Sequence, residues 1–159
     1  QEVGWTEDDK KKREAFELFV EASRARVAEI QNAAECLVLS MPGTLRHLDD
    51  VLALSAVTGV TTSRIARKQG LAGRLTAQLI AEDAADGALV AGLGIFEQGF
   101  YDRLGFGSGG YEHWLAFDPA QLEIDVRHRA PRRITPEDWE AVHASRRARL
   151  QGHGAVRQP

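Results

Sequence analysis

Cysteine and methionine are scarce in this chain of 159 residues, which has one of each. With Cys36 as the only cysteine, an internal disulfide and a cysteine-based metal cluster are excluded, and a reducing compartment is the simpler expectation. The sequence also lacks an apolar run near the roughly 20 residues that cross a bilayer, and it shows no signal-like segment. These absences predict a soluble, cytoplasmic protein with no membrane partner.

An excess of positive charge is missing too, because 20 Lys and Arg face 23 Asp and Glu and the formal net charge is -3. General nucleic-acid binders have a basic balance, so no nucleic-acid partner is expected. The five histidines show neither H-x-x-x-H nor H-E-x-x-H spacing, and we expect no metal site. Hydrophobic residues make up 43% of the chain, which is enough for the core of one globular domain.

The spacing of apolar residues predicts that helices and strands are mixed along the chain. Segments expected to be strands are 24–30, 34–41, the later half of 52–62, 88–93, 111–117 and 122–126. Segments expected to be helices are 6–22, with Thr6 and Asp9 as a capping pair, 71–85, 96–104 and the stretch from Thr135 onward. Pro42-Gly43 is expected to end the second strand.

Residues 57–79 join a β-branched run to a helix through a basic turn. Leu71, Leu75 and Leu79 recur every four residues, on one side of the expected helix. The first N–H groups of a helix have no intrahelical partner and carry the positive end of its dipole, so a turn containing Gly70 allows an anion to approach. The pattern predicts a phosphate site, but it also fits a turn in which Gly70 and Ala72 only permit tight packing.

The composition changes after residue 126. Residues 127–133 are basic and broken by Pro131, as in a linker, and Thr135 and Pro136 then have the positions of an N-cap and a first helical residue. We expect a main domain at 1–126, a linker at 127–134 and the start of a second domain at 135–159.

A second motif, F-Y-D-R-L-G-F at residues 100–106, follows the next expected strand. The order of strand, R-x-x-G-x-A turn, helix, strand and this motif resembles the acetyl-coenzyme A (acetyl-CoA) half of the GNAT superfamily of N-acetyltransferases. The match covers about residues 25–126, and residues 97–107 are most similar to the enhanced-intracellular-survival type. The resemblance implies an α/β (α+β) acyl-CoA N-acyltransferase fold, with a mixed, mostly antiparallel sheet, a splayed central strand and flanking helices. The superfamily's first strand and helix have no counterpart here, so we expect a piece of a longer protein. Proteins of this type carry two such domains in tandem, so the resemblance implies that residues 135–159 start a second, similar domain.

The resemblance also implies partners and binding residues. Acetyl-CoA would be the co-substrate and a primary amine the acceptor, which attacks directly without a covalent enzyme intermediate. The residues expected to bind the coenzyme are Val60, Thr61 and Thr62 for the pantetheine arm and Arg67, Lys68, Gln69, Gly70, Leu71 and Ala72 for the diphosphate. Gln69 and Ala72 depart from the basic residue and the glycine that are commoner at their positions. Relatives of this type form rings, so a homo-oligomer is a further expectation.

Tyr101 matches the tyrosine that protonates the departing thiolate in many family members. A phenol with a pKa of about 10 is suited to donate to a thiolate whose conjugate acid has a pKa of about 8.5. The alternative is an aromatic side chain that packs beside Phe100 and Leu104. Candidates for the general base are Glu97, Glu112 and His113, none of which the spacing favours.

The remaining conspicuous residues are expected to serve structure. Cys36 fits a small core residue. Trp5, Trp114 and Trp139 fit core or interface packing, although Trp114 is also a candidate for an acceptor pocket. Two functions stay open: an acetyl-CoA-dependent N-acetyltransferase, and a non-catalytic CoA-binding or assembly module with the same fold.

Overall fold

The computed structural model describes residues 9–95, 99–109, 114–123, 125, 127, 130–149 and 152–158. It divides the chain into two compact units, of which one comprises Gln1–Gly107 with Gly152–Pro159 and the other Ser108–Gln151. None of the helices in the described residues is long and apolar enough to cross a membrane.

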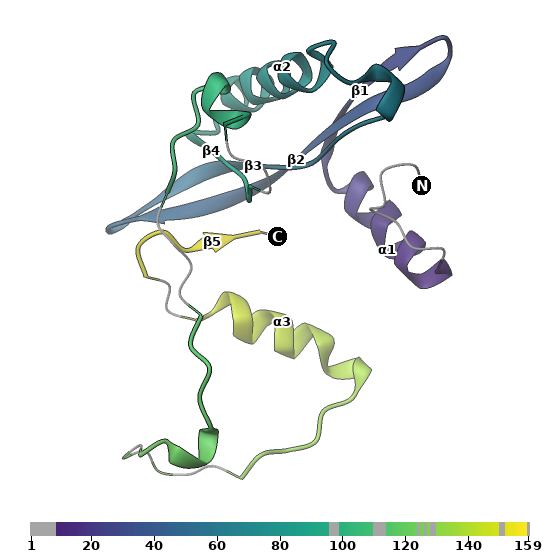
Figure 1. Cartoon of the computed structure of the whole chain (residues 1–159). Coiled ribbons are helices and arrows are strands. Elements are labelled where there is room, and N and C mark those ends of the chain that lie inside the picture. The colour runs from purple at the N-terminus through teal and green to yellow at the C-terminus, as the bar shows by residue number, and fades with distance from the viewer. Residues whose placement is uncertain are drawn as a thin grey trace. The chain divides into compact units, whose positions relative to one another are not determined.

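The first unit is built on a five-stranded sheet (Figure 1). Its strands are β1 (Arg24–Ile30), β2 (Ala33–His47), β3 (Asp50–Thr62), β4 (Val90–Gly92) and β5 (Val156–Arg157). β1, β2 and β3 are antiparallel in that order, β4 runs parallel to β3, and β5 pairs with β2. The mixed, mostly antiparallel sheet with flanking helices confirms the expected fold class.

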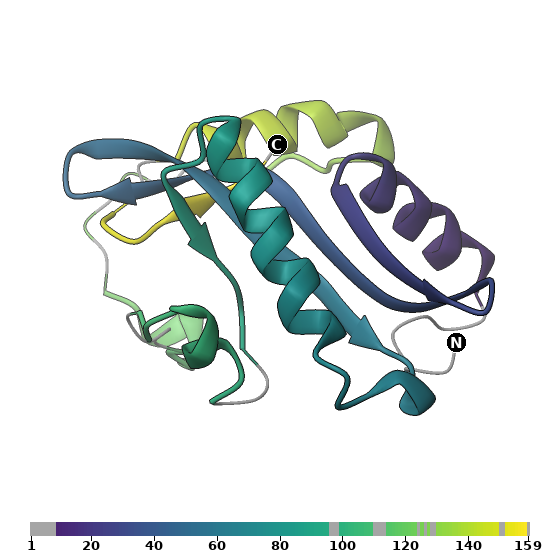
Figure 2. The ribbon, with the colours of Figure 1, turned by 90° about the horizontal axis from the view of Figure 1, so that it is seen from above.

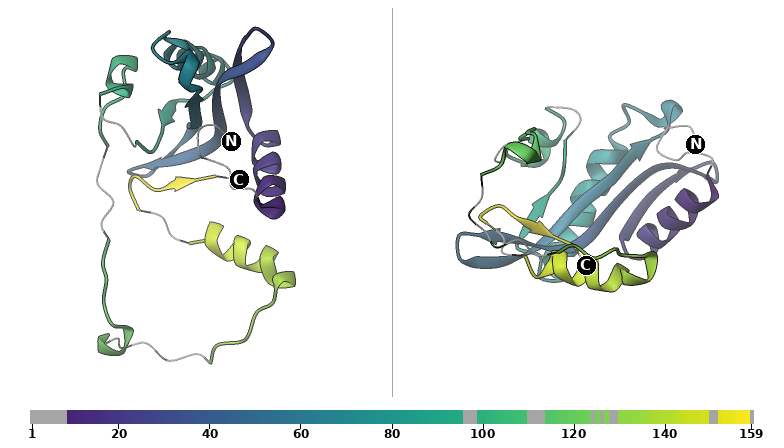
Figure 3. Two further views of the ribbon diagram at one scale, coloured as in Figure 1. Left: turned by 45° about the vertical axis from the view of Figure 1, so that its right-hand side comes forward. Right: turned by 90° about the horizontal axis from the view of Figure 1, so that it is seen from below.

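Two helices accompany this sheet. α2 (Leu71–Ala85) lies across one face, over β1, β2 and β3, and α1 (Lys10–Glu21) contacts β1 (Figures 2 and 3). Leu79 of α2 is fully buried against Val38 of β2 and Val57 of β3, and Leu75 packs against the same cluster. Two of the three leucines of the predicted row therefore face the sheet. Cys36 is 2% exposed, which confirms its expected place in the core.

Ion pairs fasten the C-terminal half of α2 to β1. Arg24 binds Asp83, with Nη1 2.6 Å from Oδ1, and also binds Asp86. Arg26 binds Glu82 through Nε, 3.2 Å from Oε1, and through Nη2. Hydrogen bonds from Gln78 and Arg26 lower the pKa of the Glu82 carboxyl below its ordinary value. Each arginine of β1 lies more than fifty positions from the carboxylates that it binds, so these ion pairs fix how α2 crosses the sheet.

The boundaries of α1 and β2 differ from the expected ones. Asp9 caps α1, with its carboxylate accepting from Lys11 N at 2.8 Å, whereas Thr6 lies outside the described residues. β2 continues through Pro42-Gly43, so the prediction that this pair ends the strand is wrong.

Two features explain why Pro42-Gly43 is tolerated within β2. On the outer side of β2, pairing with β1 stops at Ser40 and pairing with β5 starts at Thr44, so Pro42 removes no ladder hydrogen bond there. A Cβ on Gly43 would lie 2.8 Å from the Arg157 carbonyl oxygen, so the glycine allows β5 to approach.

The expected strands at 111–117 and 122–126 are absent from the residues described there. Residues 114–117, 122, 123 and 125 are not in strands, while 111–113, 124 and 126 lie outside the described part. Trp114 and Trp139 are 86% and 63% exposed, so neither packs in the core of the chain, and interface packing stays a prediction for both. Trp5 lies outside the described residues. Alternation predicts a strand only where a neighbouring strand supplies hydrogen bonds, and none pairs with the described residues of these segments.

The second unit contains the predicted helix after the linker. Thr135 and Asp138 form a capping box with Pro136 at the first helical turn, and α3 (Trp139–Arg147) follows. Residues 152–158 belong to the first unit, where β5 pairs with β2. The structural division therefore differs from the expected ranges, and a second similar domain starting in 135–159 stays a prediction.

A β-bulge in β3 was not predicted. Leu37 pairs with Thr61 and Leu39 with Thr58, so β3 has one more residue than β2 between these pairs. Gly59 lies in the bulge with φ +58°, and a Cβ there would be 3.0 Å from Leu39 Cδ1. Both the backbone angle and the space therefore require glycine.

Gly59→Ala is expected to lower the free energy of unfolding by about 2 to 4 kcal/mol, because left-handed strain and overpacking against Leu39 add. Urea denaturation measures the change. Gly73→Ala is the matched control, because Gly73 is helical and its added Cβ would meet Leu104 at an ordinary 3.7 Å. This control should gain up to about 1 kcal/mol. Equal stabilities for the two variants would contradict the role given to the bulge.

Candidate functional site

The edge of β3 is open where β3 and β4 diverge. The two strands pair only from Leu54↔Val90 to Ala56↔Gly92, and residues 93–95 then leave the sheet. Among the described residues, none pairs with 57–62 on that side of β3. The backbone N–H and C=O groups of an unpaired edge can bind an extended ligand as a further strand would.

The turn after β3 directs amide groups toward this opening. A 3-10 turn (Arg64–Ala66) leads to Lys68 at φ +63° and Gly70 at φ +72°. Gly70 caps α2 without a side chain, and Arg74 N donates to Gly70 O at 3.1 Å. The N–H groups of residues 71–73 precede this first helical bond, and no acidic residue stands in the first turn. The start of α2 therefore favours an anion.

Hydrogen bonds hold the turn in shape from the side of β2. Ser63 N donates to Glu35 O at 2.8 Å, and the Ser63 hydroxyl donates to the Glu35 carboxylate, which is 9% exposed. Thr62 Oγ1 lies 3.3 Å from Cys36 Sγ. The Gln69 side chain donates to Ile65 O at 3.5 Å. These contacts position the turn without a ligand, which reduces the entropy that binding would cost.

A cavity of about 850 Å³ connects the strand edge, the turn and the motif at 100–106. The predicted residues that line it are Val60, Thr61, Thr62, Arg67, Lys68, Gly70, Leu71, Ala72 and Tyr101. Gln69 is not among them. We call this cavity the β3 cleft. Nine of the residues named from the sequence line the β3 cleft, whereas the Gln69 side chain turns back onto the loop. That these residues bind a coenzyme stays a prediction.

The charge of the β3 cleft is one-sided. Arg67, Lys68 and Arg103 line it, and none of the described lining residues is acidic. The chain as a whole has a net charge of -3, so this local excess of positive charge is not a reflection of composition. Three cations beside a helix N-terminus suit a ligand with several negative charges.

Tyr101 is in the wall of the β3 cleft and also packs against neighbouring rings. It starts a 3-10 helix (Tyr101–Leu104) that ends at Gly105 with φ +89°, shorter than the helix expected at 96–104, of which 96–98 lie outside the described residues. Its ring centroid is 4.9 Å from that of Phe100 and 5.8 Å from that of Phe106. The Tyr101 side chain therefore packs against two rings and also lines the cleft.

Several residues of the β3 cleft were not predicted from the sequence. Arg103 and Phe100 lie within the motif that was recognised, and the helical periodicity after Gly70 could have indicated Gly73. Leu104 packs where Gly73 has no side chain, which brings the 3-10 helix against the first turn of α2. The candidate bases Glu97, Glu112 and His113 lie outside the described residues.

Comparison with known proteins gives the family. Residues 2–109 match the model of the acetyltransferase (GNAT) domain. No curated protein matches the chain. Solved structures are similar in fold, among them a conserved Enterococcus faecalis protein of unknown function, with 17% identity, a TM-score of 0.59 and coverage of 62% of this chain and 25% of that one.

Two further structures show the same likeness. Eis1 from Mycobacterium abscessus has 24% identity and a TM-score of 0.51, and the match covers 53% of this chain and 22% of Eis1. A predicted acetyltransferase of Clostridium acetobutylicum, solved with acetyl-CoA, has 15% identity, a TM-score of 0.56 and coverage of 76% and 83%. The chain thus spans about a quarter of the first two proteins. Because the family model matches more than half of the sequence and the fold agrees with it, this chain belongs to the GNAT family of acetyltransferase domains.

Proposed function

We propose that this domain is a cytoplasmic, acetyl-CoA-dependent N-acetyltransferase that transfers the acetyl group to a primary amine by direct attack. The observation that carries the proposal is the β3 cleft, in which an unpaired strand edge, the free start of α2 and three cations converge. The family match and the Clostridium structure with acetyl-CoA support it. Assembly into homo-oligomers stays a prediction.

The residues of the β3 cleft suit the parts of acetyl-CoA. The amides of Gly70, Leu71 and Ala72 would receive the diphosphate, with Arg67 and Lys68 beside them. The backbone of 60–62 would pair with the amides of the pantetheine arm. Binding of the long coenzyme would thereby place its thioester at the point where β3 and β4 separate.

The transfer needs few side chains. The neutral amine attacks the thioester carbonyl carbon, a C–N bond forms and the C–S bond breaks. A backbone N–H of β3, that of Val60 in our proposal, stabilises the developing oxyanion. Tyr101 gives its proton to the thiolate sulfur, and a base takes the proton that the new amide nitrogen loses. Glu97, Glu112 and His113 are the candidates for that base.

Turnover with a panel of amines tests the proposal. The protein is mixed with acetyl-CoA and an aminoglycoside, a lysine peptide or a small alkylamine, and free thiol is measured over time. Release that rises with one class of amine supports the transferase. Binding of CoA by titration calorimetry without any amine-dependent release favours a non-catalytic CoA-binding module, and failure to bind CoA defeats both.

Arg103→Gln should weaken CoA binding about five- to thirtyfold at low salt, because one of three cleft cations is lost from beside a polyanion. The difference from the unmodified protein should shrink as salt rises, since exposed charges are screened. Arg64→Gln is the matched control, because Arg64 is also exposed in a 3-10 turn but does not line the cleft. Equal losses for both variants would show a general charge effect only.

A further inference from the structure

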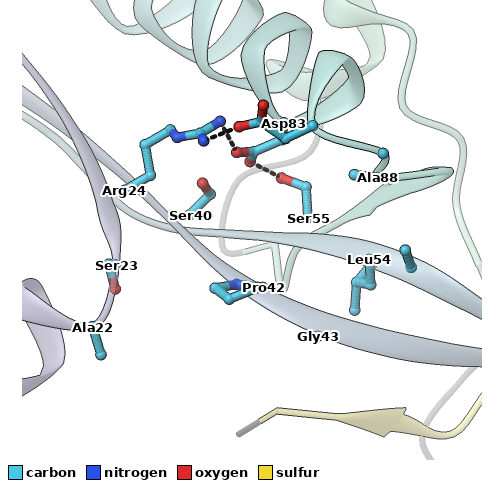
Figure 4. Close-up of a pocket in the computed structure, with 13 residues that line it drawn as sticks. Ala22, Ser23, Arg24, Ser40, Pro42, Gly43, Leu54, Ser55, Asp83 and Ala88 are labelled. Atoms are coloured by element: carbon cyan, nitrogen blue, oxygen red, sulfur yellow. Dashed lines mark hydrogen bonds and ion pairs between the residues drawn. The ribbon is translucent and has the colours of Figure 1, made fainter.

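A second cavity, of about 450 Å³, lies at the opposite end of α2 from the β3 cleft. Figure 4 shows it between the start of β1, the middle of β2 and β3, and the last turn of α2. Since α2 has 15 residues, the helix separates the two cavities by roughly 22 Å. This cavity, which we call the α2 C-terminal pocket, has no part in the transfer described above.

Polar groups in the α2 C-terminal pocket are only partly used. Asp83 has both oxygens occupied, because Oδ1 accepts from Arg24 at 2.6 Å and Oδ2 accepts from the Ser55 hydroxyl at 2.5 Å. Asp86 accepts from Arg24 through Oδ2, while its other oxygen has no partner among the described residues, and its side chain is 66% exposed. A free carboxylate oxygen therefore stands at the rim of the pocket.

Ser40 is a buried residue whose hydroxyl has no hydrogen-bond partner among the described residues. The residue is 2% exposed, lines the pocket, and none of the hydrogen bonds among the described residues involves its hydroxyl. Its Cα pairs with that of Arg24 across β1 and β2, so it stands next to the guanidinium that binds Asp83 and Asp86 (Figure 4). Because Ser40 lines the pocket and its hydroxyl has no protein partner among the described residues, this hydroxyl can donate to or accept from a ligand there.

The electrostatics of this pocket favour a cation. Asp83 and Asp86 outnumber Arg24, and their carboxylates raise the pKa of the Arg24 guanidinium. The C-terminal end of α2 also lines the pocket, and this end carries the negative end of the helix dipole. The pocket is thus opposite in charge to the β3 cleft. Its remaining lining is mainly apolar, with Pro42, Ala53 and Leu54 on the sheet.

We propose that the α2 C-terminal pocket binds a small primary ammonium ion with a compact apolar body. The ammonium group would donate to Asp86 and to the Ser40 hydroxyl, and the apolar body would cover Pro42 and Leu54. The site is separate from the β3 cleft and does not depend on the function proposed for that cleft. It gives the domain an accessory place for an amine.

Cyclohexylammonium and cyclohexanol are the matched probes, because they share a ring and differ in the cationic group. Titration of the full chain, followed by calorimetry and by NMR shifts of 15N-labelled amides, should show saturable 1:1 binding of the amine with shifts at residues 40, 55 and 83–88. The alcohol should bind at least about tenfold more weakly. Equal affinities for both probes would overturn the proposal.

Variants locate the site. Asp86→Asn and Ser40→Ala should each raise the Kd of cyclohexylammonium, by about tenfold and about fivefold. Asp49→Asn is the control for loss of one negative charge, since Asp49 is fully exposed and lies outside the pocket, and it should leave the Kd unchanged. Saturating CoA should also leave the Kd unchanged. An Asp86→Asn protein that binds as well as the unmodified one, or displacement of the amine by CoA, would contradict the proposed site.

Discussion

Gly70→Val is expected to raise the Kd for CoA by at least about 100-fold. Gly70 has φ +72°, a backbone conformation that valine adopts only at a cost of about 1 to 3 kcal/mol, so the turn would rearrange. A Cβ at this position meets nothing within 4 Å, so the new side chain would occupy open space at a position that lines the cleft. Strain and obstruction both act on the amides proposed to hold the diphosphate. Titration calorimetry with CoA measures the loss.

Gly87→Val is the control for this substitution. Gly87 follows the other end of α2, has φ +103°, and also has nothing within 4 Å of an added Cβ. It should lose comparable stability in urea denaturation and keep its affinity for CoA. If the Gly70 variant bound CoA normally, or if both variants lost it equally, the start of α2 would not be the diphosphate site.

Tyr101→Phe is expected to lower kcat by about 100-fold or more while the Kd for CoA changes little. The substitution removes the hydroxyl proposed as general acid, a role that typically contributes two to four orders of magnitude in rate. The phenyl ring preserves the edge contacts with Phe100 and Phe106, so the wall of the cleft should keep its shape. Steady-state kinetics with the best amine of the panel give kcat, and calorimetry gives the Kd.

Phe106→Leu is the companion variant for Tyr101, because it removes a ring that packs on Tyr101 and leaves the phenol in place. It should lower kcat far less than Tyr101→Phe does. Full activity of the Tyr101→Phe protein would assign the tyrosine to packing alone, which is the alternative that the sequence left open.

Local signals explain what could be predicted from the sequence. The turn at Gly70 and the leucine row of α2 depend on neighbours in the chain, and the structure places both as expected. The hairpin of β1 and β2 also depends on neighbours in the chain, because its turn at Gln31-Asn32 has the positive φ values that such a turn needs. Most of the residues that line the β3 cleft could be named from the sequence, because they come from one continuous stretch and one motif.

Long-range contacts explain what was missed. Pro42-Gly43 continues β2 because β5, more than a hundred residues later, approaches Gly43. Arg24 binds Asp83 and Asp86 across 59 and 62 positions in the sequence. No local sequence pattern predicts these ion pairs or the pocket beside them. Gly59 is a different case, since a glycine within a β-branched run is itself a signal for a bulge.

A crystal structure of the chain with CoA shows directly whether the start of α2 binds the diphosphate. We expect diphosphate oxygens about 2.7 to 3.2 Å from the amide nitrogens of Leu71 and Ala72, with the pantetheine arm along 60–62 of β3. A coenzyme bound elsewhere, with the start of α2 closed to it, would rule out the proposed diphosphate site.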